Sequence, residues 1–370
     1  MVRSRPEPLR IGNVLVGPPL VLAPMAGVTD SAYRRVMAEF GVGLVVSEMV
    51  SVQGLLRGQP GSRELCVQDP PLPVPMAVQL FGRDPELMAE AARRVEAGGA
   101  ALIDVNAGCP VKKVIRQGAG ASLLGDPDLL AAIVEAMKKA VAVPVTVKLR
   151  LGWDSESIGV VDLAVRLASA GADAISLHAR TAVQHYSGEA DWSWIGKVKK
   201  AVNVPVIGNG DVTSPALARK MLRETGCDAV MIGRATQGNP WLLAAIAEDL
   251  GYPVHCNSLP GWEDFSETVL GHIGAFCKSR PRCSGHFRKL LLWYSKGCPD
   301  AVRLRTAVSG TDRPEEMLDI FRDWVRGLND RGVSFLSSKV PAERPPGETG
   351  SPVAGLSGDS DPRVSLSGGA

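Results

Sequence analysis

The chain has 370 residues, of which 45% are hydrophobic and 22% are charged, and its formal net charge is only +2. This composition is typical of a globular protein with one large and one smaller domain, and it excludes a chain that is basic throughout, so any surface for nucleic acid must be local. Seven cysteines occur without CxxC pairs or a Cys/His ligand spacing, which favours reduced thiols over a disulfide framework or a zinc site. No apolar run is long enough to span a bilayer, and we expect a cytoplasmic protein.

Residues 1–19 contain two short apolar runs, 9–11 and 14–16, and the Gly12-Asn13 pair between them predicts a hairpin that would close the floor of a barrel. Eight further apolar runs follow, and such runs are typical of parallel strands buried on both faces. They are LVLAPMAG (20–27), GLVVSEMV (43–50), PMAVQLFG (75–82), LIDVNAGCP (102–110), PVTVKLRLG (144–152), AISLHART (174–181), PVIGNGDV (205–212) and AVMIGRAT (229–236).

Helix starts lie between these runs, where Asp84, Asp126 and Ser214 are each followed by proline, the pattern of an N-cap and a first helical residue. Eight repeats of strand and helix over residues 20–251 predict an α/β fold, a (β/α)8 TIM barrel, and we expect this domain to contain the ligand-binding site. A doubly wound sheet is the alternative, but such sheets usually have fewer strands.

After residue 251 the alternation ends, and helical periodicity predicts a small helical domain over residues 255–335. The segment 278–305 contains many basic residues and one acidic residue, Asp300. The basic residues are Lys278, Arg280, Arg282, Arg288, Lys289, Lys296, Arg303 and Arg305. This cluster indicates a phosphate-contacting surface, with a solvated helix face as the alternative, and Trp293 and Tyr294 either join that surface or belong to the core. Residues 336–370, rich in Pro, Gly and Ser, predict a disordered tail.

Polar or glycine residues interrupt the apolar runs near their carboxyl ends, where the catalytic groups of such barrels collect. The first run ends in Pro24, Met25 and Ala26, and the residues at the ends of the others are Gln79, Asn106, Cys109, Lys148, Arg150, His178, Arg180, Asn209, Gly210, Asp211, Gly233 and Arg234. Burying polar groups without partners costs several kcal/mol each, so a polar, anionic ligand is the simplest explanation.

The segments GNGD and IGR end the seventh and eighth runs and predict a phosphate site, because glycines let backbone N–H groups approach the oxygens. A plain tight turn is the alternative, and barrel enzymes that bind sugar phosphates share this feature. Lys148 would place a cation in the barrel mouth, where it can neutralise charge on a bound ring, unless it pairs with Asp104. His178 is either a ligand contact or a satisfied core histidine.

Cys109 lies between Gly108 and Pro110, and the proline predicts a loop position at the end of a strand. The residues alone leave three interpretations: a nucleophile, a proton donor and an inert thiol. Lys112 and Lys113 would lower the pKa of the thiol, as a nucleophile requires, but no histidine is near in sequence.

Together these motifs resemble the tRNA-dihydrouridine synthases, and within them the bacterial B-type subfamily. The likeness covers roughly residues 9–310; its main segments are APMAGVTD (23–30), VQLFG (78–82), DVNAGCPVKK (104–113), VKLRLGW (147–153), LHARTAVQHYSGEADW (177–192), PVIGNGDV (205–212), TGCDAVMIGRATQGNPW (225–241) and FRKLLLWYSKG (287–297). Two segments depart from the pattern: 114–124 is less basic than usual, and 308–324 matches poorly and is acidic in part.

The resemblance implies an FMN enzyme that takes hydride from NADPH and reduces the C5=C6 bond of a uridine in the D-loop of tRNA. It implies that Cys109 is the general acid, that Asn106 and Arg150 hold the uracil, and that no metal and no protein partner is needed. The implied FMN contacts are Pro24, Met25, Ala26, Gln79, Lys148, His178, Asn209, Gly210, Asp211, Gly233 and Arg234. The expected RNA contacts are Lys112, Lys113, Arg282, Arg288 and Lys289. A flavin barrel acting on a free pyrimidine and a non-catalytic tRNA-binding protein are the alternatives.

Overall fold

Eight parallel strands close into a ring in the computed structural model, which describes residues 5–68, 70–254, 261–279 and 284–335. The ring strands are β3 (Leu20–Leu22), β4 (Leu44–Val46), β6 (Met76–Phe81), β7 (Leu102–Ala107), β8 (Val145–Arg150), β9 (Ala174–His178), β10 (Val206–Asn209) and β11 (Ala229–Ile232). Pairing of β11 with β3 and of β4 with β6 completes the circle. The predicted TIM barrel is therefore confirmed.

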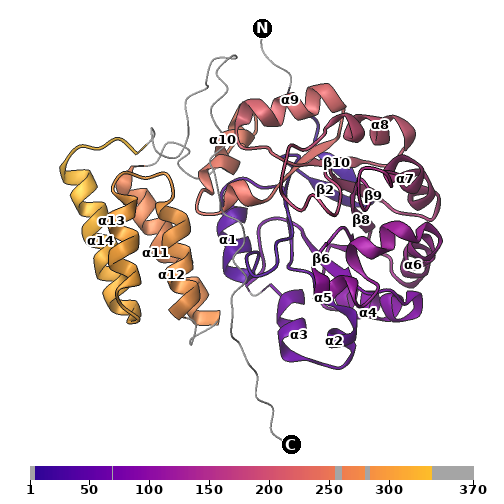
Figure 1. The fold of residues 1–370 in the computed structure, drawn as a ribbon, viewed down its shortest axis with the longest axis horizontal. Coiled ribbons are helices and arrows are strands. Elements are labelled where there is room, and N and C mark those ends of the chain that lie inside the picture. The colour runs from indigo at the N-terminus through magenta and orange to yellow at the C-terminus, as the bar shows by residue number, and fades with distance from the viewer. Residues whose placement is uncertain (1–4, 69, 255–260, 280–283, 336–370) are drawn as a thin grey trace, which may run out of the picture.

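Helices cover the outside of the ring (Figure 1). They are α1 (Ser31–Glu39), α4 (Pro85–Ala97), α6 (Pro127–Ala140), α7 (Val160–Ser169), α8 (Ser193–Ala201), α9 (Pro215–Thr225) and α10 (Trp241–Asp249). The side chains of Asp84, Asp126 and Ser214 accept backbone N–H bonds at the starts of α4, α6 and α9, as their sequence pattern predicts. Shorter pieces lie in the loops: α5 (Lys112–Ile115), η1 (Gly120–Gly125) and η2 (Arg234–Thr236).

The second predicted strand is shorter than expected, because the chain leaves the ring after Val46. A two-residue strand, β5 (Val50–Ser51), then pairs with β6, and α2 (Val52–Leu56) and α3 (Pro60–Cys66) follow it. Two polar residues mark the break: the Ser47 hydroxyl accepts the backbone N–H of Gln79, and the Glu48 carboxylate accepts that of Gly27.

The floor of the barrel is closed by an antiparallel hairpin of β1 (Leu9–Ile11) and β2 (Val14–Val16). Its buried side chains, Leu9, Ile11 and Val16, pack in one apolar cluster with inward-facing residues of the ring strands. Gly12 at the turn has φ +56°, and a Cβ there would lie 2.8 Å from Pro144 Cγ. The lower part of the barrel interior is thus filled with apolar side chains, and the polar residues are confined to the opposite end.

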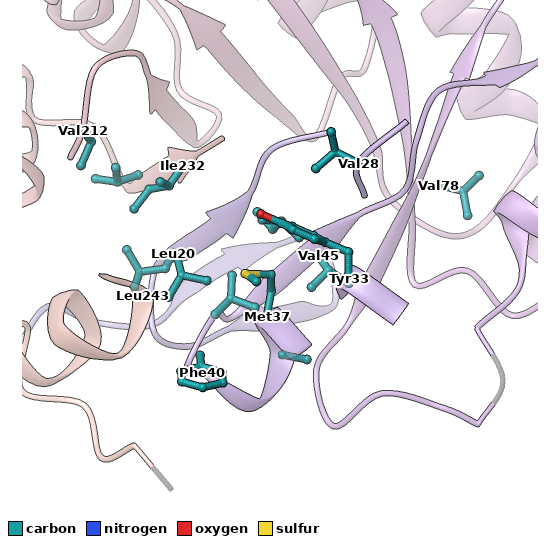
Figure 2. Close-up of a cluster of buried hydrophobic side chains, with 14 of the residues drawn as sticks. Leu20, Val28, Tyr33, Met37, Phe40, Val45, Val78, Val212, Ile232 and Leu243 are labelled. Atoms are coloured by element: carbon teal, nitrogen blue, oxygen red, sulfur yellow. The ribbon is translucent and has the colours of Figure 1, made fainter. Parts of the chain in front are cut away.

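A second apolar cluster joins the ring to its helices and to the C-terminal region. In Figure 2, Tyr33 and Met37 of α1, with Phe40 just after it, lie near Leu20 of β3 and Leu243 of α10. Four helices, α11 (Trp262–Ser279), α12 (Ser284–Ser295), α13 (Ala301–Ser309) and α14 (Pro314–Asp330), lie next to α1 and α10 (Figure 1).

These four helices share their core with the barrel. The rings of Trp241 on α10 and Phe265 on α11 have centroids 5.6 Å apart. Tyr294, which the sequence left open as a base-stacking or core residue, is buried and belongs to this core. The predicted tail, 336–370, lies outside the described residues. Within the described ranges, no helix has the length and apolarity that a bilayer crossing requires.

Candidate functional site

A cavity of about 720 Å³ opens at the carboxyl ends of the strands. Every residue expected at the cofactor, the uracil or the proton-transfer position lines it: Pro24, Met25, Ala26, Gln79, Asn106, Cys109, Lys148, Arg150, His178, Asn209, Gly210, Asp211, Gly233 and Arg234. The volume lies within the range of pockets for cofactors and drug-sized ligands. The structure therefore brings these residues together, although it does not by itself assign their roles.

The backbone around Cys109 is held on both sides. The Asn106 side-chain oxygen accepts the N–H groups of Gly108 at 3.2 Å and Cys109 at 3.0 Å, and the Cys109 carbonyl accepts the N–H of Ala121 at 3.0 Å. Gly120 has φ +63°, and a Cβ there would lie 2.7 Å from the Cys109 oxygen. The thiol is therefore presented to the cavity from a fixed loop, as the proline in the sequence predicts.

Burial raises the pKa of the Cys109 thiol above its ordinary value. A backbone hydrogen bond from Val111 and the positive charges of Arg150 and Lys148 offset part of this effect. The expectation that Lys112 and Lys113 would lower the pKa is wrong, because both side chains are exposed to solvent and desolvation dominates at the thiol. A protonated thiol at neutral pH fits a proton donor better than a nucleophile.

Lys148 does not form the ion pair with Asp104 that its sequence allowed. Its Nζ donates to Asn209 Oδ1 at 3.3 Å. Asp104 instead accepts hydrogen bonds from Gln79 Nε2 at 2.7 Å and Thr146 Oγ1 at 2.6 Å. Burial, with the nearby charge of Arg150, lowers the pKa of Lys148 to about 8, although Asp104 raises it somewhat from a distance. The ammonium group is thus a desolvated charge suited to an anionic partner.

Arg150 ties two loops of the cavity wall together. Its Nε donates to the Gly108 oxygen at 2.9 Å, and its Nη1 donates to the oxygens of Thr181 at 2.7 Å and His185 at 2.9 Å. Only 4% of Arg150 is exposed, and desolvation lowers the pKa of its guanidinium to about 10. The bonds place Arg150 directly behind the loop that carries Cys109.

His178 is buried beside several cations, so its imidazole is neutral. Desolvation, followed by the charges of Lys148 and Arg150, lowers its pKa far below the ordinary value. Arg180 Nη1 lies 3.3 Å from His178 Nε2, and Arg180 Nη2 binds Asp211 Oδ2 at 2.7 Å. The carboxylate of Asp211 also accepts the Ala190 N–H at 2.8 Å. Asp211 therefore holds the loop around the cavity through protein contacts.

Two glycines at the ends of β10 and β11 are packed closely against neighbouring side chains. Gly210 has φ +132°, and a Cβ there would lie 2.6 Å from Ala190 Cβ. A Cβ on Gly233 would approach Ala23 Cβ to 3.3 Å. Arg234, with a half-exposed side chain, lies 3.7 Å from Asp211 Oδ1 at this place. Only the three-residue turn η2 follows β11 directly, so the donors at this end are backbone N–H groups and Arg234.

Sequence reasoning missed several residues of the cavity. Tyr186 is 56% exposed at its edge, and the Arg234 guanidinium lies 4.4 Å from the centre of its ring. Met49, His185, Gln237 and Lys296 also line the cavity. Tyr186 and His185 lie within the segment 177–192 that carried the resemblance, and this was the available signal. Lys296 follows α12, so the C-terminal region contributes directly to the cavity.

The predicted RNA-binding residues are not equivalent. Lys112 and Lys113 are exposed on α5, next to the Cys109 loop. Arg288 is held by an ion pair with Asp312 at 2.6 Å. Lys289 donates to the Gly27 oxygen at 3.3 Å. Arg282 lies outside the described residues.

Comparison with known proteins decides the family. A family model for dihydrouridine synthase matches residues 21–326. The chain is 41% identical over 316 residues to a "probable tRNA-dihydrouridine synthase" of Rhodobacter capsulatus, covering 85% of this chain and 97% of the relative. The chain belongs to the dihydrouridine synthase family. The resemblance drawn from the motifs is confirmed, and the family match includes residues 308–324, where the motifs had shown a poor likeness.

Two further relatives carry the name tRNA-dihydrouridine synthase B. The protein of Xanthomonas campestris is 40% identical over 322 residues, covering 86% of this chain and 96% of the relative. That of Vibrio cholerae is 38% identical over 313 residues, covering 84% and 97%. Among solved structures, histamine dehydrogenase from Rhizobium sp. 4-9 shares the fold, with a TM-score of 0.52 and 17% identity; the match covers 72% of this chain and half of that one.

Proposed function

We propose that this dihydrouridine synthase reduces the C5=C6 bond of a uridine in the D-loop of tRNA, with FMN as bound cofactor and NADPH as hydride donor. One observation carries the proposal: a thiol, a desolvated lysine ammonium and a glycine cradle line one cavity in a member of this family. The relatives named above are tRNA-dihydrouridine synthases. A cytoplasmic location, expected from the cysteine pattern, suits a tRNA substrate.

The chemistry of the donors fits FMN. The partly buried ammonium of Lys148 lacks a carboxylate within salt-bridge distance among the described residues, so an electron-rich ring would offset the cost of its desolvation. Gly210, Gly233 and Arg234 line the same cavity, and their backbone N–H groups and the guanidinium would meet the phosphate of FMN there. Pro24, Met25 and Ala26, in the loop after β3, would line the ring.

Bound FMN would supply the hydride for C6 of the uracil. The chain's own contribution is the proton for C5, which the Cys109 thiol would donate and which leaves a thiolate on the loop. Arg150 and Lys148 act coulombically on this sulfur and stabilise its anionic form. Asn106 fixes the thiol by bonding the N–H of Cys109. Hydride and proton together saturate the C5=C6 bond.

The target uridine must leave the folded tRNA to reach such a cavity. Lys112 and Lys113 beside the Cys109 loop, and Lys296 at the cavity edge, would meet the phosphates around it. The exposed ring of Tyr186 offers an aromatic surface at the same edge. These groups favour a nucleic acid over a free pyrimidine.

The test uses the full chain and tRNA from a bacterial strain that lacks its dihydrouridine synthases. We expect the protein to bind FMN, to oxidise NADPH, and to form dihydrouridine at D-loop positions identified by mass spectrometry of tRNA fragments. Equal activity on free uridine would instead support the small-molecule oxidoreductase. A protein that cannot be loaded with FMN but binds tRNA would support the non-catalytic alternative.

A further inference from the structure

In the loop after β3, the backbone N–H and the carbonyl oxygen of Gly27 are both hydrogen-bonded to side chains from other parts of the chain. Its N–H donates to the carboxylate of Glu48, and its carbonyl oxygen accepts from Lys289 Nζ at 3.3 Å. Glu48 lies at the break after β4, whereas Lys289 lies on α12. The barrel and the C-terminal region therefore hold the same residue from two sides.

Movement at Gly27 would be transmitted to Met25, which lines the cavity. The Met25 carbonyl accepts the N–H groups of Val28 and Thr29, both at 3.0 Å, and the Met25 N–H donates to Thr29 Oγ1 at 3.0 Å. Residues 25–29 thus form a hydrogen-bonded turn whose shape depends on Gly27, which has φ +68°. A hydrogen bond to Gly27 would therefore affect the position of Met25 in the cavity wall.

Lys289 contacts an aromatic ring beside its solvent-exposed bond to Gly27. Its ammonium lies 4.6 Å from the centre of the Trp293 ring, and its side chain is half-buried. Desolvation lowers the pKa of Lys289, while the negative charges of Glu48 and Asp30 act in the opposite direction. By contrast, Lys112 and Lys113 extend into solvent, as free phosphate contacts do.

We propose that Lys289 is a positioning residue that fixes the cofactor-side turn 25–29 from the C-terminal helices, and that it is not principally a tRNA phosphate contact. This rests on the proposed function, because it assumes that the cavity holds FMN. This role differs from the one expected from the sequence, in which Lys289 belonged to a basic RNA-binding surface. The contact between Lys289 and Gly27 also connects the C-terminal helices, which would bind tRNA, to the wall of the cofactor cavity.

The decisive variant is Lys289→Met, which keeps the length of the side chain and removes the donor and the charge. Lys289→Arg keeps both and serves as the conservative rescue. Lys197→Met is the matched control, because Lys197 also lies over a tryptophan ring, at 3.6 Å from the centre of Trp194, but on α8. Hydrogen exchange of the flavin-free proteins, FMN affinity, and tRNA affinity at several salt concentrations are measured for each.

We expect Lys289→Met to exchange faster over residues 25–29 and to bind FMN about three- to fivefold more weakly, as for the loss of one solvent-exposed hydrogen bond from a charged group. Its tRNA affinity and salt dependence should stay within about twofold, which distinguishes it from a phosphate contact. Lys289→Arg and Lys197→Met should bind FMN within about twofold of the wild type.

The opposite pattern would overturn the inference: unchanged exchange and FMN affinity in Lys289→Met, with weaker tRNA binding and a salt slope reduced by about one. The same holds if Lys197→Met weakens FMN binding as much as Lys289→Met does. Failure of the wild-type protein to bind FMN is a different result, because it would refute the proposed function. In that case faster exchange at 25–29 in Lys289→Met would still support the positioning contact itself.

Discussion

Replacing Lys148 by methionine should make the flavin-free protein more stable at neutral pH, although it removes a residue of the proposed cofactor site. The pKa of Lys148 falls from 10.5 to about 8 on burial. Each pH unit of such a fall costs about 1.4 kcal/mol, so the charged form carries about 3 kcal/mol of unfavourable free energy. Losing the hydrogen bond to Asn209 destabilises the variant by about 1 kcal/mol. The expected net increase in the free energy of unfolding is therefore about 2 kcal/mol.

The sign of the pH dependence follows from the lowered pKa. Between pH 8 and 10.5 the unfolded lysine holds its proton while the folded one loses it, so the wild-type protein gains stability as pH rises. Below pH 8 the desolvation cost is present in full. The advantage of Lys148→Met over the wild type should therefore be greatest at pH 7 and should largely disappear by pH 10.

Urea unfolding of the flavin-free proteins at pH 7 and pH 10 measures this difference, with Lys197→Met as the control for loss of an exposed lysine charge. The same Lys148→Met protein should bind FMN more weakly, since it lacks the cation. Stability and binding would then change in opposite directions, as is common at functional sites. A Lys148→Met protein that is less stable at pH 7, or whose advantage persists at pH 10, would refute the reasoning.

Three further substitutions test other parts of the site. Cys109→Ala should leave FMN binding and NADPH oxidation intact but slow single-turnover uridine reduction by at least about a hundredfold; an unchanged rate would reject Cys109 as the proton donor. Gly210→Ala should lower the free energy of unfolding by about 2 kcal/mol, measured in urea, because its Cβ would meet Ala190 at a positive φ. Tyr33→Phe loses the 2.7 Å bond to Thr236, whose hydroxyl binds the Gly233 oxygen, and titration should show FMN affinity reduced about threefold; unchanged affinity would contradict this role.

The ring of strands could be predicted because a buried parallel strand leaves a local signal, a short apolar run ended by a polar residue. In β8, for example, Val147 and Leu149 pack outward, while Lys148 and Arg150 alternate with them and line the cavity. The same alternation placed the polar ends of the other strands together. Periodicity within a few residues was sufficient for this part of the site.

Contacts between distant segments could not be predicted in this way. Lys289 and Gly27 lie 262 positions apart, and nothing near either residue indicates that they meet. The bond between Glu48, which follows the second strand, and Gly27 is equally remote from local patterning. Tyr186 reaches the cavity through the shape of a loop, and loop geometry is weakly encoded in hydrophobic periodicity.

The hairpin under the barrel has a kinetic consequence. Its apolar side chains fill the axis from below, so among the described residues the barrel interior offers no passage to the proposed reaction centre from that end. The nicotinamide of NADPH and the target uracil would then both have to reach the flavin through the cavity at the carboxyl ends of the strands. Each would have to leave before the other could bind. Steady-state rates measured against both ligands should accordingly give parallel double-reciprocal lines, the signature of a double-displacement enzyme.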